Sequence, residues 1–168
     1  MNDELDSVDE AILTELQKDA RLPNKDLAAR VGVAPSTALE RVRGLRRRGV
    51  ITGFRAVVDP AALGRPMRAV LAIRVRPHTQ QLVEPFREFV LGLPETLALH
   101  HVAGPDDFHV HLAVADPTHL QQLILQQFLS RPEVVHLETT LVFQASEQPI
   151  QRPAPKLSTT SPDIADRS

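Results

Sequence analysis

The chain has 168 residues, no cysteine and a formal net charge of −2. This length allows one or two domains, and an apolar content of 42% is enough for a buried core. The absence of cysteine excludes disulfide bonds, thiolate metal sites and cysteine nucleophiles. No apolar run is long enough to span a membrane and the acidic start is unlike a signal peptide, so we expect a cytoplasmic protein.

The first predicted element is an amphipathic helix near the start of the chain. Apolar residues recur there at helical spacing, which predicts a helix from about Ser7 to Lys18. Asp6 is a good N-cap for this helix. Asp9, three residues later, places a negative charge near the positive end of the helix dipole, which is stabilising. The apolar stripe of this helix consists of Val8, Ile12, Leu13 and Leu16. Such a stripe needs another element to pack against.

The next stretch predicts a helix-turn-helix. A short helix from Asn24 to Val31 has its apolar residues on one face. Gly32 follows it, where helices commonly end in a left-handed residue that glycine adopts without steric cost. Pro35 suits the first position of a second helix. The inward face of that second helix carries Leu39, Val42 and Leu45.

The exposed side of this second helix carries candidate DNA contacts. Hydrogen-bonding side chains at its start suit base edges in the major groove, and arginines towards its end suit phosphates. From Arg41 to Arg76 the chain has ten arginines and one acid, Asp59. A helical hairpin in a bundle and a solvated arginine-rich helix are the alternative interpretations. The predicted base contacts are Ser36, Thr37, Glu40 and Arg41, and the predicted phosphate contacts are Arg43, Arg46, Arg47 and Arg48.

After the helices the pattern changes. The β-prone residues from Val50 to Val58 end at Asp59 and Pro60, which predicts a wing or linking strand. Leu63 to Pro66 indicates a hinge. From residue 145 the chain is rich in Pro, Ser and Thr and cannot bury enough apolar surface to offset the ordering entropy. The predicted division is a helix-turn-helix domain over 1–52, a linker strand and hinge over 53–68, a second domain over 69–144 and a disordered tail over 145–168.

The second domain shows alternating strand and helix patterns in the order β-α-β-β-α-β. This order is typical of the ferredoxin-like fold, an antiparallel sheet with two helices on one face. Pro85 limits where the first of these helices begins, because beyond the first turn it removes a hydrogen bond. The strands are predicted at 69–75, 96–102, 107–115 and 133–143, and the helices at 81–93 and 117–129.

The central hairpin of that sheet has one apolar face and one face rich in histidine. If the two strands pair about their turn, Leu97, Leu99 and His101 lie opposite Leu112, Val110 and Phe108 on the core face. A metal shared by histidines is one interpretation of the other face, and a polar dimer interface is the one we favour. We therefore predict no metal and no cofactor. The residues expected on this open face are Ala72, Arg74, His100, His109, His111 and His136.

The turn of the hairpin contains Gly104 and Asp107. Glycine allows close backbone approach, exposed N–H groups bind a carboxylate, and an aspartate accepts hydrogen bonds from an ammonium group. Together these groups suit the two ends of an amino acid. The alternative is that both residues only form the turn, and spacing alone favours that alternative.

Four stretches of the chain resemble one family of regulators. LDSVDEAILTEL, LAARVG, RVRGLRRRGVITGFRAVVDPAALG and HHVAGPDDFHVHLAV are similar to Lrp/AsnC feast/famine transcription regulators, and the resemblance covers about residues 5–143. Two residues depart from the family pattern. Ala34 replaces a capping serine, which weakens the cap by about 1 kcal/mol. Gly44 lies inside the second helix of the motif at a similar cost.

The resemblance implies an α+β protein with an N-terminal winged helix-turn-helix and a C-terminal ferredoxin-like domain. It implies a sequence-specific transcriptional regulator that binds a palindromic DNA site as a homodimer packed through its sheets, with an octamer as a further assembly. It also implies an amino-acid effector near the hairpin turn. The alternative function is a tetrapyrrole (sirohaem) decarboxylase on the same scaffold, but the arginine-rich helix favours the regulator over an enzyme. The implied effector-site residues are Gly104 and Asp107 by position, with Val102, Asp106 and Thr140 as neighbours.

Overall fold

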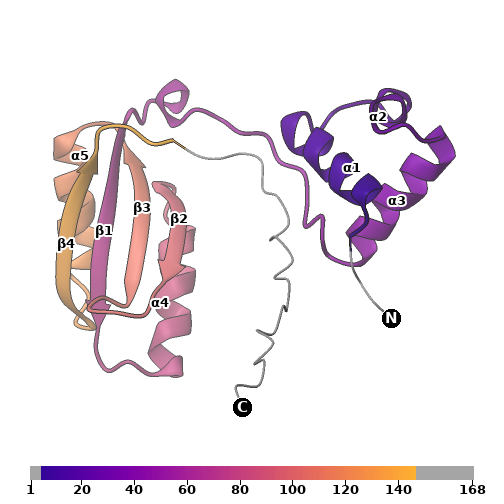
Figure 1. Cartoon of the computed structure of the whole chain (residues 1–168). Coiled ribbons are helices and arrows are strands. Elements are labelled where there is room, and N and C mark those ends of the chain that lie inside the picture. Colours follow the sequence, from indigo (N-terminus) through magenta and orange to yellow (C-terminus); the bar gives the residue numbers. More distant parts are fainter. Residues whose placement is uncertain (1–4, 147–168) are drawn as a thin grey trace, which may run out of the picture. The chain divides into compact units, whose positions relative to one another are not determined.

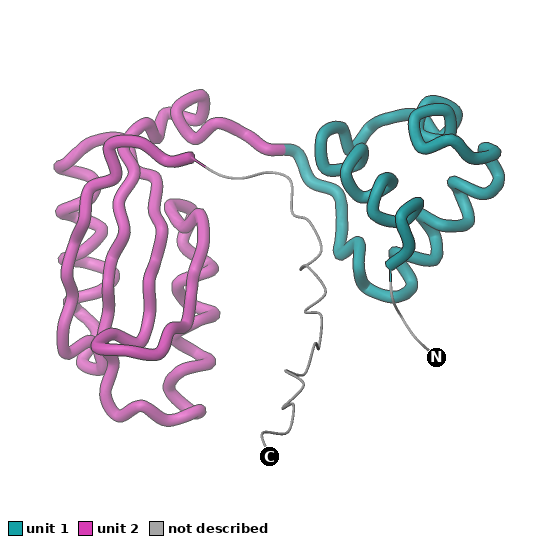
Figure 2. The backbone as a smooth tube through the Cα atoms, viewed as in Figure 1, with its two compact units in different colours: residues 1–56, 147–168 teal, residues 57–146 magenta. Residues whose placement is uncertain are grey.

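The structure, a computed structural model, describes residues 5–146, which form two compact units over 5–56 and 57–146 (Figure 2). The division falls inside the predicted linker. From residue 147 on, the predicted tail lies outside the described residues. None of the helices in the described part is long and apolar enough to cross a membrane.

The N-terminal unit consists of three helices, α1 (Ser7–Lys18), α2 (Asn24–Val31) and α3 (Pro35–Arg47) (Figure 1). These bounds confirm the predicted helices. The N-cap role of Asp6 is also confirmed, because its Oδ1 accepts hydrogen bonds from the backbone N–H groups of Val8 (3.0 Å) and Asp9 (2.8 Å). Gly32 ends α2 with a φ of 72°, which is the left-handed conformation expected at this turn.

A small apolar core joins the three helices. Ile12, Leu27 and Leu45 are its large, fully buried side chains, one from each helix. Ala38 of α3 is also buried, whereas Leu39 is 39% exposed, which corrects the prediction that Leu39 points inward. The inward stripe of α3 therefore begins at Ala38 and continues with Val42 and Leu45, as predicted for those two. The core is completed by partly buried residues, which are Leu5, Val8, Leu13, Leu16, Leu22, Val31, Val42 and Ile51.

The start of α3 has no side-chain cap. Ala34 occupies the N-cap position and makes no capping hydrogen bond, while Pro35 is the first helical residue, as predicted. Asn24 supplies a different restraint, because its Nδ2 donates to the carbonyl oxygen of Pro35 at 2.8 Å. The starts of α2 and α3 are therefore tied together across the turn.

The predicted wing or linking strand over 50–58 is not formed, which corrects the expected winged form of the domain. A strand needs a neighbour for its backbone N–H and C=O groups, and none of the described strands pairs with this segment. Ile51 is partly buried against the N-terminal core, but the apolar side chains further along are exposed, with Val57 at 95% and Phe54 at 49%. The short 3-10 helix Pro60–Leu63, capped by the Asp59 side chain, follows and ends at Gly64 with a φ of 75°.

The C-terminal unit is a four-stranded antiparallel sheet in the order β2-β3-β1-β4 with helices on one face (Figure 1). This order confirms the predicted β-α-β-β-α-β, ferredoxin-like arrangement. The elements are β1 (Met67–Val75), α4 (Gln80–Gly92), β2 (Thr96–His101), β3 (Phe108–Val114), α5 (Pro117–Leu123), the π-helical turn Ile124–Phe128 and β4 (Val134–Val142).

Both helices of this unit differ in detail from the prediction. Helix α4 begins at Gln80, so Pro85 lies beyond the first turn. Proline has no backbone N–H, so the helix continues through Pro85 with one hydrogen bond fewer. The second helix does not run unbroken to Leu129. It is α-helical to Leu123 and then widens into a π-helical turn, in which the Leu129 N–H donates to the carbonyl oxygen of Ile124.

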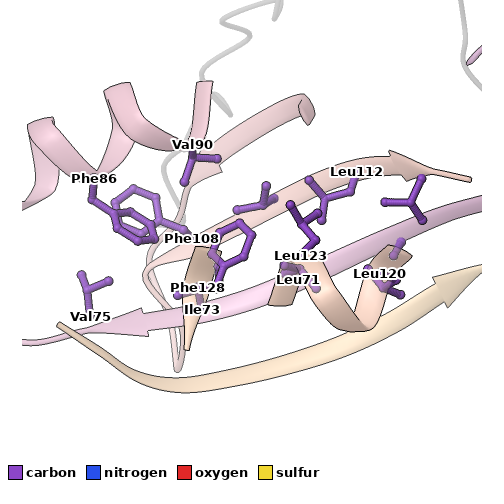
Figure 3. Close-up of a cluster of buried hydrophobic side chains, with 13 residues drawn as sticks. Leu71, Ile73, Val75, Phe86, Val90, Phe108, Leu112, Leu120, Leu123 and Phe128 are labelled. Atoms are coloured by element: carbon purple, nitrogen blue, oxygen red, sulfur yellow. The ribbon is translucent and has the colours of Figure 1, made fainter. Parts of the chain in front are cut away.

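The core of the C-terminal unit lies between the sheet and the two helices (Figure 3). Alternate residues of β1 and β3 point into it, which gives each strand one buried face. Phe108 is fully buried, with ring centroid 5.1 Å from that of Phe86 on α4. The buried residues are Ala69, Leu71, Ile73, Val75, Phe86, Val90, Phe108, Val110, Leu112, Val114, Leu120, Leu123 and Phe128.

The predicted pairing of the β2–β3 hairpin is confirmed for two pairs, Leu99 with Val110 and His101 with Phe108. The third pair was wrong, because Thr96 rather than Leu97 lies opposite Leu112. The register shifts between Thr96 and Ala98, where β2 contains one residue more than β3, as in a β-bulge. Leu97 is this extra residue, and it is 46% exposed.

One histidine joins α5 to the connection between α4 and β2. The Ala115 N–H donates to Nδ1 of His119 at 3.3 Å, and Nε2 of His119 lies 3.0 Å from Oε1 of Glu95. Glu95 directly precedes β2, and its carbonyl oxygen accepts from the Ala113 N–H of β3. The start of α5 is therefore attached to two strands.

Candidate functional site

Helix α3 presents a polar stripe to solvent. Ser36, Glu40, Arg43 and Arg47 recur at helical spacing on the side opposite the buried Ala38, and all four are exposed. Arg43 Nη1 lies 2.9 Å from Glu40 Oε1, an exposed pair that contributes little stability and leaves both side chains accessible. The stripe therefore combines hydrogen-bonding and cationic groups on one rod-like surface.

A shallow hollow follows the same side of α3. It is lined by Ser36, Thr37, Glu40, Arg41 and Arg47, which include all four predicted base-reading residues. Arg46 is also exposed, on the flank of the stripe. The structure thus brings together most of the residues predicted to contact DNA, because they share one face of one helix.

Arg41 and Arg48 are placed differently from the rest, since both guanidinium groups bind acids of α1. Nη1 of Arg41 lies 2.5 Å from Oδ2 of Asp6 and 3.0 Å from Oδ1 of Asp9. Nη2 of Arg48 lies 3.3 Å from Oδ2 of Asp9. The hydrogen bonds to Asp6 and Asp9 raise the pKa of Arg41, so this side chain keeps its positive charge.

The two acids that hold these arginines were not predicted as site residues. Asp9 is 7% exposed and is the buried charged residue of the described chain. The pKa of Asp6 is lowered by the hydrogen bond from the Asp9 N–H and by the hydrogen bond from Arg41. A sequence signal for Asp9 existed, because it precedes Ile12, Leu13 and Leu16 at helical spacing and so faces the other helices.

The predicted effector residues divide between two places. Val102, Gly104, Asp106 and Asp107 lie together in the loop between β2 and β3. This loop meets the end of β1, where the Asp107 N–H donates to the carbonyl oxygen of Ile73. Thr140 is on β4 opposite Val70, three residues before Ile73 on β1, and so it is not part of the loop cluster.

The Asp107 carboxylate makes three contacts within its own chain. Oδ2 accepts hydrogen bonds from the Val75 N–H at 2.8 Å and from Nη1 of Arg76 at 2.9 Å, and Oδ1 lies 2.9 Å from Nδ1 of His78. Burial raises the pKa of Asp107, but the Val75 hydrogen bond and the nearby His78 and Arg76 outweigh burial and leave the pKa below its usual value. An ammonium group would have to share or displace these partners.

Arg76 and His78 were missed from sequence although a topological signal existed. They directly follow β1, and in a ferredoxin-like sheet the end of β1 lies beside the loop that enters β3. Arg74 restrains the same loop, because its Nε donates to the carbonyl oxygen of Pro105 at 2.6 Å and its Nη2 lies 3.8 Å from Oδ1 of Asp106. Gly104 has a φ of 148°, which side-chain-bearing residues rarely adopt.

The sheet face opposite the helices carries the predicted histidines. His100 pairs with His109 across the hairpin, and the His100 ring centroid lies 5.1 Å from that of His111. Burial lowers the pKa of His111, and the charges of His100 and His109 lower it further. The register places Ala72, Arg74 and His136 on the same face, as predicted. Within the described residues, no three His, Cys, Asp or Glu side chains are grouped to hold a metal ion.

Comparisons with known proteins match both units. Residues 5–46 match the AsnC-type helix-turn-helix domain, and residues 68–153 match the Lrp/AsnC ligand binding domain. The HTH-type transcriptional regulator AldR of Mycolicibacterium smegmatis is 35% identical over 141 residues, which cover 84% of this chain and 82% of AldR. The leucine-responsive regulatory protein of Haemophilus influenzae is 33% identical over 147 residues, which cover 88% of this chain and 89% of that protein.

A solved structure gives the same result. The crystal structure of a transcriptional regulator from Neisseria meningitidis in complex with L-Met aligns with a TM-score of 0.80 and 26% identity, covering 86% of this chain and 94% of that one. All three similar proteins are named as regulators, and the decarboxylase alternative is not favoured. From the matches to both of its units, this chain belongs to the Lrp/AsnC family of transcriptional regulators.

Proposed function

We propose that this protein binds double-stranded DNA at a palindromic site as a homodimer, with α3 as the recognition helix in the major groove. The observation that carries the proposal is the polar, cationic stripe of α3, which is exposed on the side opposite the core contacts. Two-fold symmetry would present two such helices to the two halves of the site. A role on DNA also accords with a cytoplasmic location.

The residues of the stripe have different roles in this proposal. Ser36, Thr37 and Glu40, near the start of α3, offer hydroxyl and carboxylate groups to base edges. Arg43, Arg46 and Arg47, further along, neutralise phosphates and release their condensed counterions. Arg41 and Arg48 are already paired with acids and take a separate role, which is considered below.

The C-terminal domain would bind an amino acid or a related small molecule and so change the affinity for DNA. Support comes from the match to a ligand binding domain and from the L-Met complex of the Neisseria meningitidis relative. In this chain the β2–β3 loop, with Val102, Gly104, Asp106 and Asp107, is the proposed site, and Thr140 on β4 is a more distant candidate. The open histidine-bearing face would pack in the homodimer, and dimers would assemble into octamers.

The DNA-binding part is tested by a mobility shift on the protein's own upstream DNA over a series of salt concentrations. Arg47→Ala should weaken binding to all sequences and reduce the slope of log affinity against log salt by about one per chain, because one phosphate contact is lost. Arg87→Ala is the matched control, since Arg87 is an exposed arginine of α4. An unchanged slope for Arg47→Ala would remove Arg47 from the interface, and no binding by the wild type would end the proposal.

The effector part is tested by adding each of the twenty amino acids to the same assay. At least one should shift the midpoint of DNA binding. Gly104→Ala should abolish that shift while leaving DNA binding without effector intact, because a side chain strains the loop at a φ of 148°. A response that survives in Gly104→Ala would place the effector elsewhere.

A further inference from the structure

Four charged side chains join α1 to α3 in the DNA-binding unit. They are Asp6, the N-cap of α1, Asp9 in the first turn of α1, Arg41 of α3 and Arg48, the C-cap of α3. We call them the α1–α3 ion network. Asp9 is its centre, because each of its carboxylate oxygens faces a different arginine, at 3.0 Å for Arg41 and 3.3 Å for Arg48.

The network adjoins the proposed DNA-binding surface. A small hollow beside it is lined by Asp9, Arg41, Arg47 and Arg48, together with Gly44 and Leu45. Arg47 belongs to the exposed stripe, so a phosphate that reaches Arg47 also approaches the arginines of the network. Arg41 and Arg48 keep 32% and 29% of their side-chain surface exposed and are therefore accessible to a competing anion.

A phosphate can attract these two arginines only in competition with Asp9. The backbone of Asp9 is fixed in the first turn of α1 by the Asp6 cap, and its carboxylate is buried, so it cannot follow the arginines outward. Losing both arginines would leave an unpaired charge in a poorly solvated place. The acids of α1 thus oppose contacts between DNA phosphates and Arg41 or Arg48.

We propose that Asp9 is a specificity-determining residue, which withholds Arg41 and Arg48 from phosphates and so limits sequence-independent DNA binding. The inference rests on the proposed DNA-binding function. Phosphate attraction supplies essentially all non-specific affinity, whereas base contacts discriminate between sequences. When Arg41 and Arg48 are withheld from phosphates, the affinity for random DNA therefore falls by a larger factor than the affinity for the protein's own site. The preference for that site rises as a result.

The test compares binding of the full chain to operator DNA and to a random duplex of equal length, each over a range of salt. Asp9→Asn keeps the shape of the side chain and removes its charge. In this variant Asp6 still binds Arg41 at 2.5 Å, so Arg41 is loosened and Arg48 loses the Asp9 charge. The salt slope on random DNA should therefore steepen by about one per chain. Affinity for random DNA should rise several-fold at low salt, and the ratio of operator to random affinity should fall.

Three further variants separate this effect from simpler ones. Glu10→Gln makes the same charge change on an exposed residue of α1, so it should leave the slope near the wild-type value. Asp6→Asn retains a capping oxygen and loosens Arg41 alone, so it should give a smaller increase than Asp9→Asn. Adding Arg41→Gln to Asp9→Asn should remove the part of the increase that Arg41 causes.

Circular dichroism and thermal unfolding fix a temperature at which all variants are folded. A purely structural role would lower the melting temperature of Asp9→Asn and leave the salt slope unchanged, which would overturn the inference. An equal rise of the slope in Glu10→Gln would also overturn it, because net charge alone would then be the cause. Failure of the wild type to bind DNA would instead refute the proposed function.

Discussion

The two units of the chain are stabilised in different ways. The N-terminal unit has three large, fully buried apolar side chains, one from each helix, and the C-terminal unit has a continuous core of thirteen buried residues. A small helical unit buries little surface, so single contacts and ion pairs contribute a larger share of its stability. The N-terminal unit accordingly supplements its small core with ion pairs that join Arg41 and Arg48 to a capping acid and a buried acid.

The largest expected effects come from removing core side chains, and they should differ between the units. Phe108→Ala should cost the C-terminal unit about 3–5 kcal/mol and Leu45→Ala the N-terminal unit about 2–5 kcal/mol. Because the N-terminal core is smaller, Leu45→Ala should unfold its unit at room temperature, whereas the C-terminal unit with Phe108→Ala should stay folded. Two-dimensional NMR of the full chain distinguishes the units. Loss of both sets of signals in Leu45→Ala would show that they fold as one.

The next effect concerns the loop held by Asp107. Asp107→Ala leaves the Val75 N–H without its acceptor and should cost about 1–3 kcal/mol. Because the folded pKa of Asp107 lies below the usual 3.8, its contribution is complete above that pH and is lost as the pH falls through the lowered value. Denaturant titrations should therefore show the gap between wild type and Asp107→Ala narrowing below about pH 4. A constant gap would mean that the charge of Asp107 adds nothing.

A gain of stability is expected at Gly44 of α3. Gly44→Ala should stabilise the N-terminal unit by about 1 kcal/mol, because alanine favours the helix and its Cβ would meet nothing closer than Arg47 Nη2 at 3.9 Å. Gly32→Ala is the opposing control and should destabilise the unit, since Gly32 has a φ of 72°. Melting temperatures measure both changes. A loss of stability in Gly44→Ala would contradict this prediction, because it would mean that the added methyl group collides with a neighbouring side chain.

The smallest effect is expected on the open sheet face. Burial and the charges of His100 and His109 lower the pKa of His111, so the folded state resists protonation. Folded stability should therefore fall as the pH drops below the ordinary value of 6.5, and His111→Gln should reduce that dependence. The free energy of unfolding of the wild type and of His111→Gln, each at pH 5.5 and pH 8, measures this dependence. Equal slopes for the two proteins would show that His111 does not contribute.

The helices of the N-terminal unit could be predicted from sequence because their signals are local. Asp6 and Pro35 mark the starts of α1 and α3, and Gly32 marks the end of α2. The apolar spacing between these markers predicts the same helices. The exposed face of α3 followed from the same spacing. The pairing of Arg41 with Asp6, 35 residues away, could not be predicted, because it depends on how α1 crosses α3.

The sheet was predictable in its order and less so in its details. Alternation identified β1 and β3, whose buried faces are continuous. The bulge at Leu97 shifts the register of β2 against β3. This shift was not predicted, because nothing in the local residues marks an extra residue in the strand. The segment over 50–58 has strand propensity but no pairing partner in the described chain, so propensity alone was misleading. At the loop, Asp107 was identified, but Arg76 and His78 required knowledge of which strand ends meet.

The double attachment of His119 fixes the chemical form of its ring. Because Nδ1 accepts a hydrogen bond from the Ala115 amide, the hydrogen of the neutral imidazole is on Nε2, where it is donated to Glu95. A single tautomer gives two well-separated ring nitrogen-15 shifts, whereas a freely exchanging imidazole averages them. His119 is therefore a built-in spectroscopic reporter of whether α5 remains docked when an effector is added.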